Sequence, residues 1–345
     1  MKYAYLLLAS LVFFGCNPDQ TVQDQSTNDY LSFANRDDQF TGGIKMIPIS
    51  TPKGEFKVWT KRVGSNPTMK VLLLHGGPGG THEEFVCYDG FLPSEGIEYI
   101  YYDQLGSYYS DQPDDTTLWD MGRFADEVEQ VRIALKLDST NFFLLGHSGG
   151  GILAIEYALK YQQNLKGLII SNMMASVPDY NRYAQEVLGP QLDPAVYGEI
   201  QAIEAKKDFT NPRYSELLMT HYYTKHILRM PLDEWPESIN RAFKHTNQKI
   251  YVYMQGYSEF GITGNASLRD WDRKADLPKI KVPTLTIGAQ FDTMDPKHME
   301  WMSQQVQRGR YLNCPNGSHI CQYDDQKVYF EGLIRFIRDV DSKAF

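Results

Sequence analysis

The sequence predicts an α/β protein in which a mostly parallel, doubly wound sheet carries an inserted helical cap. Three observations predict it. Short apolar runs, several of them closed by glycine, alternate with helical patterns, as parallel strands and their covering helices do. The alternation stops at residue 173 and resumes near residue 279. The chain has 345 residues and is 42% hydrophobic, which supplies a sizeable core and excludes extensive disorder.

The strands come first in this prediction. Residues 42–62 are typical of two strands joined by a turn at residues 52–54. Further strands are expected at residues 69–75, 98–103, 141–146, 165–171, 282–288 and 311–314. Helical patterns occupy residues 124–137, 150–161, 296–306 and 328–340. A strand followed by a helix and then by another strand favours parallel neighbours in one sheet.

Residues 173–278 interrupt this pattern. The segment is polar, mostly helical in period and divided by prolines into short helices. We interpret it as an inserted helical cap that separates two parts of one core, residues 41–172 and residues 279–345. The alternative is that these helices simply complete the main domain.

The N-terminus has the features of a targeting segment. Lys2 precedes an apolar stretch at residues 3–14, which is shorter than the roughly 20 residues of a membrane-spanning helix but typical of a secretory signal. A small residue before Cys16 resembles the lipobox of bacterial lipoproteins. We therefore expect a lipoprotein signal peptide at residues 1–15, lipidation of Cys16 and a flexible tether at residues 16–40. An ordinary signal peptide and a buried strand are the alternatives.

These expectations imply an exported protein of the cell envelope that is held to a bacterial membrane by its lipid alone. The formal net charge of −9 argues against nucleic acid as a partner, because such binders need clustered Lys and Arg. Four cysteines exclude a disulfide scaffold. Cys314 and Cys321 are near enough in sequence to pair, and free buried thiols are the alternative. No metal motif occurs, and we expect no cofactor.

The clearest chemical motif lies at residues 146–150, which read Gly-His-Ser-Gly-Gly. Gly-x-Ser-x-Gly between a predicted strand and a predicted helix is a nucleophile elbow, in which a strained turn exposes the serine hydroxyl. Glycine is needed on both sides because a Cβ there would collide with neighbouring elements. We expect Ser148 to be the nucleophile. A structural glycine-rich turn is the alternative.

An activated serine needs a base and an acid that orients the base. In this kind of fold their order along the chain is serine, acid, histidine. Asp292 follows a predicted strand and is the expected acid, with Asp295 and Asp276 as weaker rivals. His319 lies in the loop after the last predicted strand and is the expected base. His298 falls in the first turn of a helical segment, so we expect it at the surface.

Two backbone amides should stabilise the oxyanion. One belongs to Gly149, directly after the nucleophile, and the other to Gly77 in the glycine-rich loop after a strand. Pro78 has no N–H and cannot serve. The same loop lacks the Gly-Lys-Ser/Thr ending of a phosphate-binding loop.

Together, the His-Gly-Gly-Pro-Gly-Gly sequence at residues 75–80, Asp-Gln-Leu-Gly at residues 103–106, the elbow and the order of Asp292 and His319 resemble the proline iminopeptidase family of α/β-hydrolases. The closest resemblance is to its tricorn-interacting-factor type. The resemblance covers roughly residues 45–340. It implies an α/β-hydrolase fold and a serine aminopeptidase that releases N-terminal residues, often proline, from short peptides with a free N-terminus.

The resemblance also implies a substrate-binding residue. Glu259 matches a cap-side acid that binds the substrate α-amino group in this family; a solvated acid is the alternative. Thr293 stands where close relatives carry a second acid, which leaves the preference for proline open. An esterase or amidase of the same fold, acting on small non-peptide substrates, is the alternative function, because fold and triad do not set the substrate. A non-catalytic peptide-binding lipoprotein is a third reading.

Overall fold

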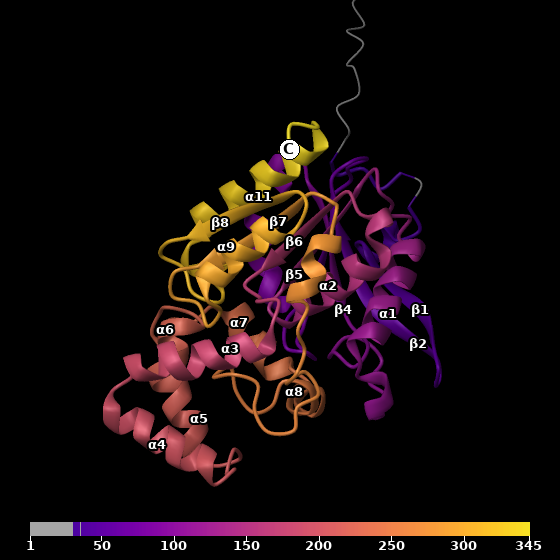
Figure 1. The fold of residues 1–345 in the computed structure, drawn as a ribbon. Helices are drawn as coiled ribbons and strands as arrows, with labels where there is room; N and C mark the ends of the chain where they lie inside the picture. The colour runs from indigo at the N-terminus through magenta and orange to yellow at the C-terminus, as the bar shows by residue number, and fades with distance from the viewer. Residues whose placement is uncertain (1–29, 35) are drawn as a thin grey trace, which may run out of the picture.

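The computed structural model describes residues 30–34 and 36–345. This part of the chain forms an eight-stranded sheet in the order β1-β2-β4-β3-β5-β6-β7-β8 (Figure 1). β2 pairs antiparallel with β1 and β4, and the other neighbours are parallel. The strands are β1 (Ile44–Thr51), β2 (Gly54–Val63), β3 (Lys70–Leu74), β4 (Glu98–Asp103), β5 (Phe142–His147), β6 (Gly167–Ser171), β7 (Thr284–Ala289) and β8 (Gly309–Cys314). The predicted fold class is confirmed.

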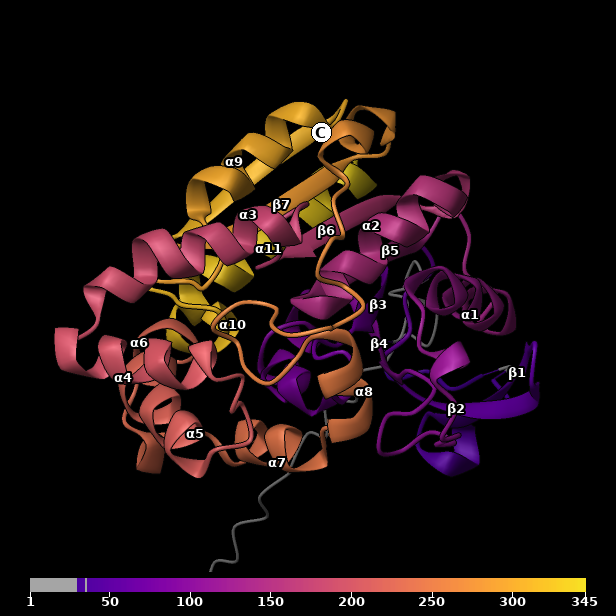
Figure 2. The same cartoon turned by 60° about the horizontal axis from the view of Figure 1, so that its bottom comes forward.

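Helices cover both faces of the sheet (Figure 2). One face carries α1 (Met121–Ala134), α2 (Gly149–Tyr161) and α9 (Pro296–Gln305), and the other carries α11 (Gln326–Asp341) and the 3₁₀ segment η2 (His82–Gly90). Alternate residues of β3 serve the two faces. Leu72 and Leu74 pack with the first set of helices and Val71 and Leu73 with the second. Burial on both faces explains why the central strands are continuous apolar runs.

Element ends differ from the prediction by a few residues. α1 starts at Met121, three residues before the expected start, because the Asp120 side chain accepts a hydrogen bond from the Arg123 N–H at 3.0 Å. Such a cap satisfies a donor that would otherwise have no partner in the first turn. The short polar segment before the apolar pattern is therefore part of the helix.

The segment between β6 and β7 contains a group of short helices that gathers at one end of the sheet (Figures 1 and 2). They are α3 (Val177–Tyr183), α4 (Pro194–Ala205), α5 (Pro212–Leu218), α6 (Thr224–His226), α7 (Glu237–His245) and α8 (Gln248–Met254). α4 and α5 begin with proline, and their preceding residues Asp193 and Asn211 cap them. The group has an apolar core of its own, rich in Tyr, Leu and Ile. A short helix, α10 (Cys321–Asp324), follows β8.

The chain enters and leaves this cap at one neck. Ser176 and Asp272 form an isolated antiparallel bridge. The Val177 N–H donates to the Trp271 carbonyl at 2.9 Å and the Arg273 N–H to the Ala175 carbonyl at 2.8 Å. The Ser176 hydroxyl also donates to the Asp272 carboxylate at 3.0 Å. The two chain segments are therefore fastened to each other where the cap begins.

The expected signal peptide, Cys16 and the first part of the expected tether lie outside the described residues. The later part of that tether differs from the prediction. The Tyr30 hydroxyl donates to the Ile97 carbonyl at 3.2 Å, and Arg36 pairs with Asp38 at 2.7 Å and donates to the Gly64 carbonyl at 2.9 Å. These residues lie against the core because each finds a specific partner there, which a polar composition does not reveal.

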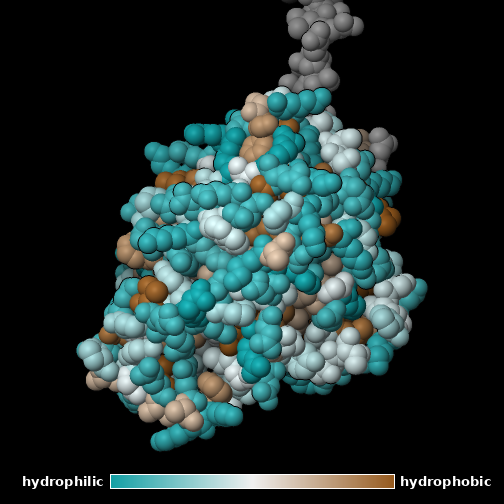
Figure 3. Space-filling model, viewed as in Figure 1, coloured by the Kyte–Doolittle hydropathy of each residue, from teal (hydrophilic) through white to brown (hydrophobic). Residues whose placement is uncertain are grey.

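The face seen in Figure 3 is mostly hydrophilic, with scattered hydrophobic residues. None of the described helices combines the length and the apolar composition that crossing a bilayer requires.

Candidate active site

Ser148 occupies the turn between β5 and α2 in a backbone conformation that residues other than glycine rarely adopt. Its φ is 53° and its ψ is −125°, and a positive φ outside glycine is strained. The flanking glycines make the turn possible. A Cβ on Gly146 would lie 2.0 Å from the Gly150 carbonyl oxygen, and one on Gly150 would lie 2.1 Å from the Leu74 carbonyl oxygen. The predicted elbow therefore has the backbone that holds a serine hydroxyl clear of the chain.

Ser148, His319 and Asp292 come together from the ends of three strands. His319 Nε2 lies 2.8 Å from Ser148 Oγ, and His319 Nδ1 lies 2.7 Å from Asp292 Oδ1. Asp292 follows β7 and His319 follows β8. All three are buried, Asp292 completely. With a proton on Nδ1, His319 offers the Nε2 lone pair to the serine, so this geometry permits proton transfer from Ser148 to His319.

The electrostatics of His319 favour its charged form. Burial alone would lower its pKa, but the Asp292 carboxylate outweighs burial, and the pKa of His319 is raised above its ordinary value. The carboxylates of Glu259 and Glu84 act in the same direction. The neutral imidazole that can accept a proton is therefore reached at a higher pH than for a free histidine.

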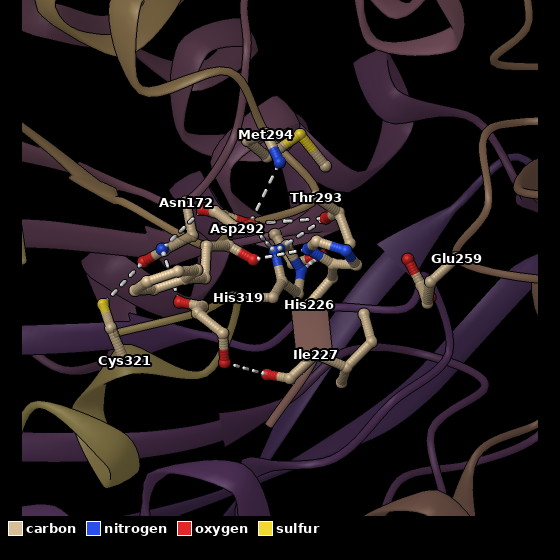
Figure 4. A network of polar contacts seen from close by, with 12 residues as sticks. Asn172, His226, Ile227, Glu259, Asp292, Thr293, Met294, His319 and Cys321 are labelled. Atoms are coloured by element: carbon tan, nitrogen blue, oxygen red, sulfur yellow. Dashed lines mark hydrogen bonds and ion pairs between the residues drawn. The ribbon is translucent and has the colours of Figure 1, made fainter. Parts of the chain in front are cut away.

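The Asp292 carboxylate is held by several donors besides His319 (Figure 4). The Asn172 amide donates at 2.7 Å, the Met294 N–H at 3.0 Å and the Thr293 hydroxyl at 3.3 Å. Thr293 Oγ also lies 3.2 Å from His319 Nδ1. Sequence reasoning missed Asn172, which lies directly after β6. Its position after a predicted strand, at the same sheet edge as the other site residues, is the signal that could have found it.

Gly77 and Gly149, the predicted oxyanion donors, lie against each other beside Ser148. A Cβ on Gly149 would lie 3.1 Å from the carbonyl carbon and oxygen of Gly77, and one on Gly76 would lie 2.9 Å from the Ser148 Cβ. Gly149 is the first residue of α2, so its N–H has no acceptor within the helix. The peptide units of both glycines are thus adjacent to the serine, where an oxyanion needs donors.

A pocket of about 240 Å³ opens at Ser148 and His319 between the sheet and the cap. On the cap side its lining is mainly apolar: Met219, Tyr223, Ile227, Ile239, Ala242 and Phe243. Two carboxylates, Glu84 and Glu259, also line it, and none of its described lining residues is Lys or Arg. The pocket therefore suits a small, partly apolar molecule that carries positive charge.

Glu259 lies after α8, to the right of the triad network in Figure 4. The Tyr251 hydroxyl donates to its Oε1 at 2.5 Å, and the Gln255 amide approaches its Oε2 at 3.5 Å. Burial raises the pKa of Glu259, and the negative charge of Glu84 adds to the increase, whereas His319 and the Tyr251 hydrogen bond oppose it. A nearby cation would favour the ionised form.

The rival residues take other places. Asp295 caps α9, as expected from its position before a proline, and Asp276 forms an ion pair with Lys279 at 2.6 Å. His298 was expected at the surface, which is wrong: its side chain is 10% exposed, and its Nε2 accepts from the Ala175 N–H at 3.3 Å. The first turn of α9 faces the chain that leads into the cap rather than solvent.

The cysteines of the described chain carry no disulfide. Cys314 and Cys321 are buried and free, and Cys87 is also free. The Cys321 thiol donates to Asn172 Oδ1 at 3.3 Å (Figure 4). Among the described residues, no three His, Cys, Asp or Glu side chains are grouped so that they could hold a metal ion.

Comparison with known proteins places the chain in a family. A family model described as "alpha/beta hydrolase fold" matches residues 70–326. Proline iminopeptidase of Elizabethkingia meningoseptica is 61% identical over 300 residues, which cover 87% of this chain and 100% of that protein. The chain belongs to the proline iminopeptidase family of α/β-hydrolases. Proline iminopeptidase of Flavobacterium johnsoniae is 60% identical over 298 residues, covering 86% of this chain and 99% of that protein.

A solved structure agrees on the fold. Proline iminopeptidase from Mycobacterium smegmatis superposes with a TM-score of 0.78 at 24% identity, covering 88% of this chain and 100% of that chain. The family and the enzyme class predicted from the sequence, a serine hydrolase, are confirmed.

Proposed function

We propose that this enzyme is a serine aminopeptidase that releases N-terminal residues, preferentially proline, from short peptides with a free N-terminus. The observation that carries the proposal is the Glu259 carboxylate in the pocket beside Ser148. None of the described residues that line this pocket is Lys or Arg. A peptide α-ammonium is the group that such a pocket attracts, and a carboxylate that holds it fixes which carbonyl reaches the serine.

The proposed reaction has two stages. Ser148 attacks the carbonyl of the first residue while His319 takes its proton, and Asp292 keeps the imidazole oriented and stabilises its charge. The amides of Gly77 and Gly149 stabilise the tetrahedral oxyanion. His319 then gives its proton to the leaving amine, which leaves an acyl-enzyme on Ser148. Water, deprotonated by His319, hydrolyses this ester and frees the N-terminal residue. These steps need no cofactor.

Glu259 is the proposed anchor for the substrate ammonium. Tyr251 provides one clear donor to its carboxylate, so the second oxygen retains acceptor capacity toward the pocket. Burial raises the pKa of Glu259 and so disfavours its charged form. The positive charge of the arriving ammonium stabilises the ionised carboxylate. A charge-assisted hydrogen bond of this kind contributes roughly 1.5–3 kcal/mol.

Two observations support proline as the preferred residue. The relatives with 60–61% identity are named proline iminopeptidase. The pocket is small and largely apolar on its cap side, which matches a compact ring better than a long or charged side chain. A preference for alanine or leucine would keep the mechanism and change the specificity.

A panel of aminoacyl arylamides tests the proposal. We expect rapid cleavage of prolyl substrates with a free N-terminus, and much slower cleavage when the amine is acylated. Simple aryl esters run beside them test the esterase alternative. Equal rates on free and blocked substrates would refute the aminopeptidase proposal, and absence of Ser148-dependent labelling by a fluorophosphonate probe would refute the serine mechanism.

We also propose that the enzyme is exported and anchored through a lipid on Cys16. The support is the basic start, the short apolar stretch and the cysteine that follows a small residue. In a bacterial host, the wild type should incorporate labelled fatty acid and sediment with membranes. Cys16→Ser should lose both properties; a variant that still incorporates the label would contradict the lipid site.

A further inference from the structure

The residue before the nucleophile joins three loops of the active site through its ring. His147 Nδ1 lies 3.1 Å from Glu84 Oε1, and His147 Nε2 lies 2.9 Å from the main-chain carbonyl of His319. The same Glu84 oxygen accepts the Gly76 N–H at 3.0 Å. Glu84 therefore reaches the loop of the oxyanion glycines, and His147 reaches the loop of the catalytic histidine.

Counting protons on His147 shows that its ring must donate at Nε2. A peptide carbonyl can only accept, so Nε2 carries hydrogen. A neutral ring then has a lone pair at Nδ1, facing a carboxylate oxygen that also has only lone pairs. This contact is favourable only if a second proton lies between the two side chains. The side chains of His147 and Glu84 are 2% and 16% exposed, so the contact is only partly accessible to solvent.

We propose that Glu84 and His147 form an imidazolium–carboxylate pair whose second proton fixes the oxyanion loop, the Ser148 turn and the His319 loop relative to one another. The two residues are positioning residues, because neither touches the reacting atoms. The proposal rests on hydrolysis at Ser148 but not on the preference for a free N-terminus.

The other charges near the pair are consistent with this assignment. The His319 ring lies 5.1 Å from the His147 ring, measured between centroids. Glu259, from the cap, interacts electrostatically with His147 and Glu84, and the Cys87 thiol interacts with Glu84. Asp292 lies beyond His319, at its Nδ1. The pair is neutral as a whole, so it can lie next to the oxyanion site without the repulsion that a lone carboxylate would exert on a developing negative charge.

Glu84→Gln separates this proposal from a role of Glu84 as a second ammonium anchor. An amide cannot serve both partners: its oxygen can keep the Gly76 bond only while facing the Nδ1 lone pair, and its NH₂ group can satisfy Nδ1 only by leaving Gly76. The positioning role predicts a fall in kcat of about 10- to 100-fold, of similar size on prolyl arylamides and on an aryl ester without an amine, with little change in KM.

The matched control is Glu259→Gln, which removes the other pocket carboxylate. It should weaken turnover of free-amine substrates and leave the ester unaffected. If Glu84→Gln behaves like this control, or if it leaves kcat unchanged on every substrate, the positioning role is wrong. If the wild type shows no selectivity for a free amine, the proposed aminopeptidase function is refuted. The comparison of Glu84→Gln with the wild type on the ester would still test the positioning role.

Two further readouts do not depend on Glu84→Gln folding. In Ser148→Ala protein labelled with ¹⁵N-histidine, both His147 ring nitrogens should show the shifts of protonated imidazolium at neutral pH; a neutral ring would overturn the pair. His147→Gln, which cannot pair with Glu84 as a cation, should have a lower kcat on the aryl ester than the wild type; an unchanged kcat would contradict the positioning role.

Discussion

Asp292 from the core and Glu259 from the cap are both close enough to His319 to affect its pKa, and they differ in the number of hydrogen-bond donors that they have. Asp292, from the core, accepts from His319, Asn172, the Met294 amide and Thr293. Glu259, from the cap, has Tyr251 as its close donor. A carboxylate with several donors is already fully engaged, whereas a buried carboxylate with few donors gains most from an external cation. We therefore expect the core to carry the general chemistry and the cap, through Glu259, to carry the selectivity for a charged amine.

The substitution Asp292→Asn should have the largest effect among the tests of this contrast. The amide cannot stabilise the imidazolium of His319 and favours the wrong tautomer, so kcat should fall by about 10⁴-fold. The loss should be similar for free-amine arylamides, blocked arylamides and esters, measured by steady-state kinetics. A loss confined to one substrate class would contradict the assignment of Asp292 to the common chemistry.

Glu259→Gln tests the other half. We expect kcat/KM for prolyl arylamides to fall by about 10- to 100-fold, since a charge-assisted hydrogen bond is lost, while ester hydrolysis stays within about twofold of wild type. The ester serves as the internal control for folding and for the triad. A parallel loss on esters would place Glu259 in the catalytic machinery instead.

Asn172→Ala weakens the supply of donors to Asp292 without removing the carboxylate. The 2.7 Å hydrogen bond from Asn172 to Asp292 is lost together with the other contacts of this side chain, so kcat should fall by about tenfold on all substrates. Thermal unfolding of the same variant shows whether the effect is local, because Asn172 also accepts from Cys321. An unchanged kcat would mean that the remaining donors suffice to hold Asp292.

Tyr251→Phe should give the smallest effect and a pH signature. Removing the phenol takes away a donor that lowers the pKa of Glu259, so the carboxylate should protonate at higher pH than in the wild type. Binding of free-amine substrates should therefore weaken a few-fold near neutrality. It should recover as the pH rises toward about 8, where peptide α-amino groups begin to lose their charge. A uniform, pH-independent loss would show that Tyr251 acts by packing.

The sequence predicted what short-range patterns encode. Apolar runs closed by glycine located the strands. Gly146, Ser148 and Gly150 predicted a turn, and the close backbone contacts at both glycines explain why no larger residue fits there. The strand-end positions of Asp292 and His319 followed from the order of residues in this kind of fold. These features depend on neighbours in sequence or on one known topology.

Contacts between residues that lie far apart in the chain could not be predicted from the sequence. Asn172 meets Asp292 across 120 residues, and Glu84 meets His147 across 63, with no motif linking either pair. The anchoring of Tyr30 to Ile97 has the same character, which is why a polar segment was taken for a tether. Such contacts follow from the three-dimensional arrangement, and a single sequence contains no periodic signal for them.

The neck of the cap has a practical consequence for engineering. Ser176 and Asp272 form a bridge, and backbone hydrogen bonds on either side of it join the two chain segments. The residues between them therefore form an insertion whose two ends are held together. A transplant from a homologue should be cut inside this bridge, between residues 177 and 271. Asn172 and Asp292 then remain with the recipient, and substrate selectivity is exchanged while the catalytic groups are retained.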